Sequence, residues 1–225
     1  MERTTAGDGA GVEHWPGGGA TILDDVTPSE TLSVQPVISA IVPDDPTLGL
    51  VERILLGTDA TVVRLLEVCF HEVICTAQLS QVCTPALPTD AELELNGDER
   101  ILRRKTLLEG SRTGRTYVYA ESAIVLDRLE RGMAEALLST SETIGHLLLA
   151  DRVESFRELV RVGRMHAGPL GDRFGLDGED ELSCRTYRII MGGQPAMLIT
   201  EYLPPSTAAP EDGGSAEARA TEGDA

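Results

Sequence analysis

The sequence is poor in aromatic residues and in cysteine, and each shortage excludes something. Aromatic residues make up only 4% of the 225 residues, so the core of any domain must be mostly aliphatic. The four cysteines, at 69, 75, 83 and 184, form no CxxC pair and match no zinc-ligand spacing. They are therefore predicted to be reduced thiols, and no metal site is expected.

Basic residues are also scarce, with 19 Lys and Arg against 37 Asp and Glu and a formal net charge of −18. Much of this charge lies at the two ends of the chain. Residues 1–46 hold eight acidic residues against one basic residue, and residues 205–225 hold five against one. A chain this acidic is a poor binder of the negatively charged phosphate backbone of nucleic acids, so no nucleic-acid partner is expected.

Long apolar runs and several well-known catalytic motifs are missing as well. No stretch reaches membrane-spanning length, and no apolar segment near the N-terminus is typical of a secretory signal. GxSxG, HExxH, Walker and Rossmann patterns do not occur. We expect a cytoplasmic protein without membrane contact, a monomer or small homo-oligomer whose partner is a small molecule.

The composition divides the chain into three parts. Residues 1–46 are rich in Gly, Asp, Thr and Pro and are expected to be a flexible acidic extension, although the run 32–42 is apolar enough to dock on the body. Residues 47–204 carry sustained hydrophobic periodicity and form the predicted domain. Residues 205–225 are predicted to be a disordered acidic tail.

Within the body, the hydrophobic spacing predicts an α+β domain with an antiparallel sheet. Glycine-containing loops suit hairpins, and no βαβ rhythm is present. The predicted order is two helices, three strands, two helices and three strands. The third element from the end, 153–165, is ambiguous by pattern alone. The expected ranges are helices around 48–57 and 58–66, strands 73–82, 100–108 and 116–126, helices 131–138 and 142–150, then strands 153–165, 184–191 and 196–203, with 168–180 as a loop.

Two charged side chains stand out in apolar strands. Strand alternation separates Arg104 from both of its basic neighbours, so it is either an odd cation on a charged face or an inward anchor for an anion. Glu201 lies between Thr200 and Tyr202 in the last strand. It is either a surface position or an acid in a ligand pocket, because burying a carboxylate without partners is costly.

Three segments of the sequence resemble the chorismate pyruvate-lyase family, and more closely its actinobacterial and archaeal branch of 4-hydroxybenzoate synthases. They are AESAIVLDRL, VESFRELVRVG and CRTYRIIMGGQPAMLITEYLP, and the last contains the fairly specific pattern YRxxxGGQPxMxxTE. The resemblance covers roughly residues 48–204. It implies a six-stranded antiparallel sheet with helical flaps over a buried ligand pocket, and it favours a strand at 153–165.

The resemblance also implies a set of site residues. The arginine that holds the ring carboxylate falls on Arg104, and the carboxylate at the other end of the pocket falls on Glu201. Main-chain contacts from the flaps fall near Ala60 and Ile144. Arg188 belongs to the pattern of the branch and is expected to meet a second carboxylate of the substrate, a task that Arg185 could equally perform.

The reaction that the resemblance implies splits chorismate into 4-hydroxybenzoate and pyruvate without any cofactor. Two alternatives remain open from the sequence. One is a lyase that acts on aminodeoxychorismate or isochorismate. The other is a non-catalytic ligand-sensing domain of the same fold, which is expected to follow a DNA-binding module that the acidic residues 1–46 do not resemble.

Overall fold

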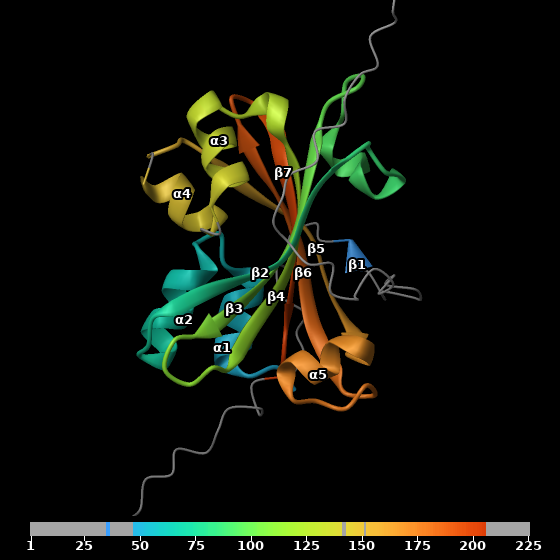
Figure 1. Cartoon of the computed structure of the whole chain (residues 1–225). Helices are drawn as coiled ribbons and strands as arrows, with labels where there is room; N and C mark the ends of the chain where they lie inside the picture. Colours follow the sequence, from blue (N-terminus) through green and yellow to red (C-terminus); the bar gives the residue numbers. More distant parts are fainter. Residues whose placement is uncertain (1–34, 37–46, 141–142, 151, 206–225) are drawn as a thin grey trace, which may run out of the picture. The chain divides into compact units, whose positions relative to one another are not determined.

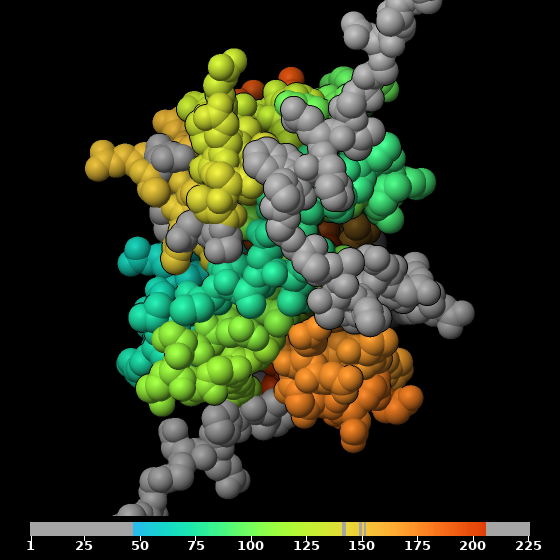
Figure 2. Space-filling model, in the orientation of Figure 1, coloured from blue at the N-terminus to red at the C-terminus, as the bar shows by residue number. Residues whose placement is uncertain are grey.

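An antiparallel β-sheet forms the centre of the computed structural model, which describes residues 35–36, 47–140, 143–150 and 152–205. Within these residues the sheet has six long strands and one two-residue strand. They are β1 (Gln35–Pro36), β2 (Ile74–Thr84), β3 (Ile101–Gly110), β4 (Thr116–Val125), β5 (Phe156–His166), β6 (Glu181–Met191) and β7 (Gln194–Leu203). The spatial order is β1-β5-β6-β7-β4-β3-β2, which places β7 in the middle. Only small areas of β7, coloured red, are visible in the space-filling view of Figure 2, in agreement with this central position.

The hairpins expected from the sequence are present. β6 and β7 pair in antiparallel fashion through a turn in which Gly192 and Gly193 have φ angles of 56° and 79°. Glycine adopts such angles without the steric cost that a Cβ atom brings. The predicted α+β class and six-stranded antiparallel sheet are confirmed, and the ambiguous segment at 153–165 is a strand.

The small strand β1 is an addition to the expected sheet. Gln35 pairs with Val162 and Pro36 with Arg161, so part of the apolar run 32–42 adds to the edge of β5. The expectations for the rest of residues 1–46, and for 206–225, lie outside the described residues.

Four helices lie on one face of the sheet, to the left in Figure 1. They are α1 (Leu50–Gly57), α2 (Val62–Phe70), α3 (Arg131–Ser139) and α4 (Ile144–Ala150). The α2 helix begins later than the sequence indicated, with Thr61 as its N-cap in place of Thr58 or Asp59. Its residues Val63 and Leu66 pack in a core cluster with Leu56 of α1, and burying one leucine side chain contributes about 2 kcal/mol.

Short elements cover the opposite face. The 3₁₀ helix η1 (Pro88–Leu93) packs Leu93 onto the sheet, while η3 (Gly168–Leu170) and the single turn α5 (Gly171–Phe174) cover the end near Tyr119 and Tyr202. The segment 168–180 was expected to be a loop throughout, so α5 corrects that expectation. It begins at Gly171, where a Cβ would lie 2.6 Å from the Leu176 carbonyl oxygen, a separation that only glycine permits.

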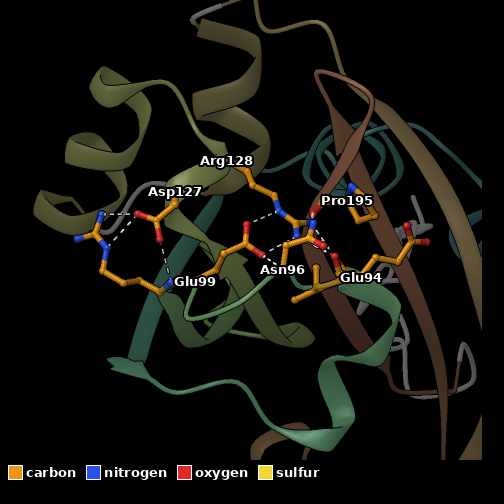
Figure 3. Close-up of polar contacts among 8 residues, drawn as sticks. Glu94, Asn96, Glu99, Asp127, Arg128 and Pro195 are labelled. Carbon is orange, nitrogen blue, oxygen red and sulfur yellow. Dashed lines mark hydrogen bonds and ion pairs between the residues drawn. The ribbon is translucent and has the colours of Figure 1, made fainter.

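An arginine at the end of the short 3₁₀ helix η2 (Leu126–Arg128) ties three separate segments together (Figure 3). Arg128 donates to the carbonyl oxygens of Leu93 and Pro195, at 2.6 and 2.5 Å, and pairs with Glu99 at 2.7 Å. These contacts connect the chain after η1 and the beginning of β7 to η2. The pairing with Arg128 also lowers the pKa of Glu99. None of the described helices is both long and apolar enough to cross a membrane.

Candidate functional site

A cavity that is partly open to solvent lies on the helix-covered face of the sheet. Its walls come from two core clusters, one around α1 and α2 and the other around α3 and α4. Mostly apolar cavities with a few converging polar groups commonly hold small organic ligands. The lining residues are Thr61, Val62, Val63, Thr76, Arg104, Thr106, Leu108, Ala120, Ser122, Thr143, Ile144, Gly145, Arg157, Tyr187, Ile189, Ile199 and Glu201.

Arg104 brings a cation into this cavity from β3. It is 2% exposed, and its Nη2 donates to Gln78 Oε1 of β2 at 3.0 Å. Burial lowers its pKa, because taking the guanidinium out of water disfavours its charged form. Lys105, the next residue on β3, pairs with Glu121 at 3.7 Å and is not part of the lining, as strand alternation predicted.

Glu201 of β7 lines the cavity, and two side chains of the neighbouring strand β6 hold it in place. Arg185 Nε donates to Glu201 Oε2 at 2.7 Å, and the Tyr187 hydroxyl donates to Oε1 at 3.0 Å. Burial is the largest single effect and acts to lower the pKa of Arg185, but the charge of Glu201 and the interactions with Tyr187 together outweigh it, and the pKa is raised. Burial and the Glu201 charge together raise the pKa of Tyr187. The carboxylate therefore has a fixed orientation, and both of its oxygens already accept a hydrogen bond.

Two chain segments, which we call the roof, contribute the side of the cavity opposite the sheet. They are Thr58–Thr61, before α2, which lines the cavity through Thr61, and Thr143–Gly145, at the beginning of α4. They touch each other, since a Cβ on Gly145 would lie 2.5 Å from Thr61 Cγ2. Arg185 Nη1 donates to the Thr58 carbonyl oxygen at 2.7 Å, which connects the roof to the Glu201 ion pair.

These features suit a small organic anion. The cavity is mostly apolar, and it contains a buried guanidinium from one strand and a braced carboxylate from another. A guanidinium binds a carboxylate through two parallel hydrogen bonds, which gives both affinity and orientation.

Comparison with known proteins identifies the family. A family model described as "Chorismate pyruvate-lyase Rv2949c-like" matches residues 56–209, a range that includes every residue lining the cavity. The chain belongs to this family. It is 37% identical over 153 residues to the chorismate pyruvate-lyase of Mycobacterium leprae, covering 67% of this chain and 72% of that protein. It is 30% identical over 158 residues to the chorismate pyruvate-lyase of Mycobacterium tuberculosis strain H37Rv, covering 67% and 78%.

Solved structures with a similar fold include regulators. A GntR-family transcriptional regulator from Bacillus cereus shares 11% identity, with a TM-score of 0.46, and the match covers 60% of this chain and 93% of that one. A GntR-family regulator from Enterococcus faecalis V583 shares 9% identity, with a TM-score of 0.45 and coverage of 57% and 92%.

Three of the five site residues expected from the chorismate pyruvate-lyase resemblance meet at the cavity: Arg104, Glu201 and Ile144. Ala60 does not line it. Its amide N–H donates to Thr58 Oγ1 at 3.0 Å, and the next residue, Thr61, takes the place at the wall. Of the residues around Ala60 in this segment, Thr61 is therefore the one at the cavity wall.

Arg188 is on the wrong face of β6 to contact a ligand in this cavity. It pairs with Glu158 and Glu94, both at 2.7 Å, and donates to the Glu92 carbonyl oxygen at 3.1 Å. Because side chains alternate along a strand, Arg185 and Tyr187 face the helices while Arg188 faces η1. The expectation for Arg188 is corrected on this geometry. Arg185, the alternative considered, braces Glu201 and is not part of the lining.

One cation of the cavity was missed by the sequence reasoning. Arg157 of β5 lines the cavity, although alternation counted back from the buried Val162 puts it on the other face. A register shift between Leu159 and Arg161 reverses the alternation. Such a bulge inserts one residue into a strand, and the pattern of residues 153–165 gave no sign of it.

The described residues contain no group of three or more His, Cys, Asp or Glu side chains that could hold a metal ion. All four cysteines are free thiols: those at 69, 75 and 83 are exposed and Cys184 is buried. Burial raises the pKa of the Cys184 thiol to about 11.

Proposed function

We propose that this chorismate pyruvate-lyase family member eliminates pyruvate from chorismate to give 4-hydroxybenzoate in the cavity described above. The observation that carries the proposal is the meeting of Arg104 and Glu201 in one cavity that lies wholly inside the matched family region. The curated relatives in mycobacteria are named for the same activity.

Arg104 is the proposed anchor for the ring carboxylate. Its guanidinium is buried, so its attraction for an anion is weakened little by water. Two parallel hydrogen bonds to the carboxylate fix the plane of the ring relative to β7, which carries Glu201.

Glu201 is proposed to lie beside C3 and C4 of the ring and to accept a hydrogen bond from the 4-hydroxyl group. Arg185 and Tyr187 hold it in place before the substrate arrives, so no reorganisation is needed at the moment of reaction. Both of these partners are buried.

The elimination needs little more than this arrangement. The bond between C3 and the ether oxygen breaks, and its electron pair leaves with the enolpyruvyl oxygen. The hydrogen at C4 departs as a proton, and its electron pair completes the aromatic ring. The proton ends on the methylene carbon of the leaving enol, which gives pyruvate, either by direct transfer or through Glu201. All atoms of chorismate are then accounted for, and no oxidant or cofactor is required.

The two alternatives from the sequence differ in what they predict. A lyase for isochorismate or aminodeoxychorismate would use the same cavity but release salicylate or an aminobenzoate. The sensing alternative is not favoured, because the matching family and the curated relatives are lyases.

A direct comparison of substrates tests the proposal. The protein is incubated separately with chorismate, isochorismate and aminodeoxychorismate, and the aromatic product is identified by chromatography. We expect turnover to be fastest with chorismate and its product to be 4-hydroxybenzoate. Salicylate or an aminobenzoate as the main product would replace chorismate as the substrate, and the absence of any turnover would remove the catalytic proposal.

Variants on β3 provide the matched control. Arg104→Met removes the cation that faces the cavity, and Lys105→Met removes a cation from the opposite face of the same strand. The hydrogen bonds to a charged group are each worth about 1.5–3 kcal/mol, so we expect Arg104→Met to lower kcat/KM by at least about 100-fold. Lys105→Met should change it by less than about threefold, because exposed ion pairs contribute little.

A further inference from the structure

We propose that Arg157 binds the second carboxylate of the substrate, the one on the enolpyruvyl group, and so distinguishes substrate from aromatic product. This inference rests on the proposed function. It gives a place in the cavity to the carboxylate for which Arg188 is wrongly oriented.

The position of Arg157 fits this role. It comes from β5, whereas Arg104 comes from β3, and the strands β6, β7 and β4 lie between them. Four steps between neighbouring strands separate their backbones by roughly 19 Å. Both side chains line the same cavity, so the two guanidinium groups approach it from opposite ends with Glu201 of β7 between them. A molecule with a carboxylate at each end matches this arrangement.

The contacts of Arg157 differ from those of the other arginines on β5. Arg161 pairs with Glu92 at 3.1 Å and Arg164 with Glu181 at 3.3 Å. Arg157 instead donates to neutral oxygens of the roof, the Asp59 carbonyl at 3.2 Å and Thr61 Oγ1 at 3.5 Å. These are long contacts to uncharged acceptors, and a carboxylate forms stronger, charge-assisted hydrogen bonds to the same donors.

The charge of Arg157 is felt at Tyr187, the residue that holds Glu201. Its charge acts to lower the pKa of Tyr187, against the larger effects of burial and of Glu201, which raise it. Tyr187 donates directly to Glu201, so the Arg157 charge reaches the region where the C3–O bond is proposed to break. A cation there also stabilises negative charge on the departing enolpyruvyl group.

This arrangement makes a prediction that separates the two arginines. Chorismate carries both carboxylates, but 4-hydroxybenzoate retains only the ring carboxylate. Removal of Arg104 should therefore weaken binding of both molecules. Removal of Arg157 should weaken binding of chorismate alone.

The experiment compares Arg157→Gln, Arg157→Lys and the control Arg161→Gln with the wild-type full-length protein. KM and kcat are measured with chorismate through pyruvate release, and the Kd of 4-hydroxybenzoate is measured by calorimetry. For Arg157→Gln we expect kcat/KM to fall about 10- to 100-fold, as for loss of hydrogen bonds to a charged group, while the Kd of 4-hydroxybenzoate changes by less than about threefold. Arg157→Lys, which keeps the charge but not the planar fork, should lie between Gln and wild type.

The possible outcomes separate a substrate-binding role of Arg157 from a structural role. An equal loss for both ligands in Arg157→Gln and Arg157→Lys would show a structural role and overturn the proposal, as would unchanged kcat/KM. Binding of 4-hydroxybenzoate also reports whether each variant is folded. If Arg157→Gln is not folded, the measurements on Arg157→Lys decide between the two roles. If the wild-type protein releases no pyruvate, the proposed function fails by itself, independently of these ratios.

Discussion

At the scale of single residues, the ion pair between Arg185 and Glu201 links stability to the site. Both side chains are buried, with the Arg185 side chain 1% and the Glu201 side chain 7% exposed. Taking two charges out of water costs free energy that only their mutual attraction and further hydrogen bonds recover. Arg185 gains such a bond from the Thr58 carbonyl oxygen, and Glu201 from Tyr187.

Removing one partner of this pair should therefore cost stability as well as activity. Glu201→Gln leaves the Arg185 charge buried without its counter-ion, and we expect the free energy of unfolding to fall by about 3 kcal/mol. In the double variant Arg185→Met with Glu201→Gln, no charge is left behind, so stability should recover in part while activity stays low. Urea unfolding of wild type, Arg185→Met, Glu201→Gln and the double variant measures the coupling free energy. A double variant that loses as much unfolding free energy as the two single variants together would contradict the coupling.

The sequence allowed some of these residues to be placed and not others, for a physical reason. Alternation along β3 was regular, so Arg104 could be separated from its basic neighbours by counting alone. The Arg188 prediction came from the family pattern, although simple alternation along the strand puts Arg188 on the face opposite Tyr187. Arg157 could not be placed, because the bulge in β5 shifts the alternation and depends on pairing with β6.

At the scale of elements, the contact between the two roof segments controls how the cavity is closed. Gly145 is inside α4, and the space where its Cβ would stand is occupied by the methyl group of Thr61. The approach of α4 to the chain before α2 thus depends on the absence of a side chain at this position. A glycine inside the predicted helix 142–150 indicates that another segment can approach closely there, but the sequence does not identify Thr61 as the neighbour.

Gly145→Ala should separate these segments. We expect kcat/KM for chorismate to fall by roughly 10- to 100-fold, since displacements of about 1 Å at a site have effects of this size. Alanine favours the helix by about 1 kcal/mol over glycine, so stability should not fall in parallel. Thr61→Ser removes the obstructing methyl group but keeps the hydroxyl, and in combination with Gly145→Ala it should restore most of the activity. If Thr61→Ser restores nothing, the roof contact is not the cause.

A second element, the β3–β4 hairpin, is fastened by one carboxylate. Glu72 accepts hydrogen bonds from the Tyr117 hydroxyl at 2.5 Å and from Thr113 Oγ1 at 2.8 Å, and from the amides of Arg112 and Thr113. The hydrogen bond from Tyr117 is the main cause that lowers the pKa of Glu72 from 4.5 to about 2, against the opposing effect of burial. The carboxylate is ionised in the folded protein over a range of pH in which it is protonated in the unfolded chain.

This pKa predicts how stability depends on pH. A lowered pKa contributes stability that is complete above about 4.5, the unfolded value, and is lost as the pH falls toward 2. Glu72→Gln should therefore be less stable than wild type at pH 7, and the difference should shrink between pH 5 and pH 2. Tyr117→Phe should give an intermediate dependence. Unfolding by urea at several pH values measures it, and a difference that stays constant down to pH 2 would contradict the assignment.

At the scale of the whole molecule, the antiparallel sheet and its two helix pairs explain why a cavity exists at all. The cluster of α1 and α2 and the cluster of α3 and α4 each pack on the sheet, and the cavity is lined by residues of both. The order of elements and the antiparallel class followed from periodicity and glycine-rich turns in the sequence. The position of the cavity did not follow from periodicity and turns. It depends on how the two helix pairs pack next to each other on the same face of the sheet.

The acidic character of the chain affects how the cavity can bind an anionic substrate. The formal net charge is −18, and the proposed substrate is itself an anion with two carboxylates. Long-range attraction does not favour such a substrate, so local cations must supply the binding energy. Arg104 and Arg157 are the arginines that line the cavity among the residues that the structure describes.

The most direct test of the account is the balance of products from chorismate. Full-length protein is incubated with chorismate without added metal or cofactor, and pyruvate and 4-hydroxybenzoate are quantified in the same samples over time. We expect the two products to form in equal amounts in wild type, and we expect Arg104→Met to slow the formation of both by at least about 100-fold while Lys105→Met does not. Pyruvate without 4-hydroxybenzoate, or equal activity in the two variants, would contradict it.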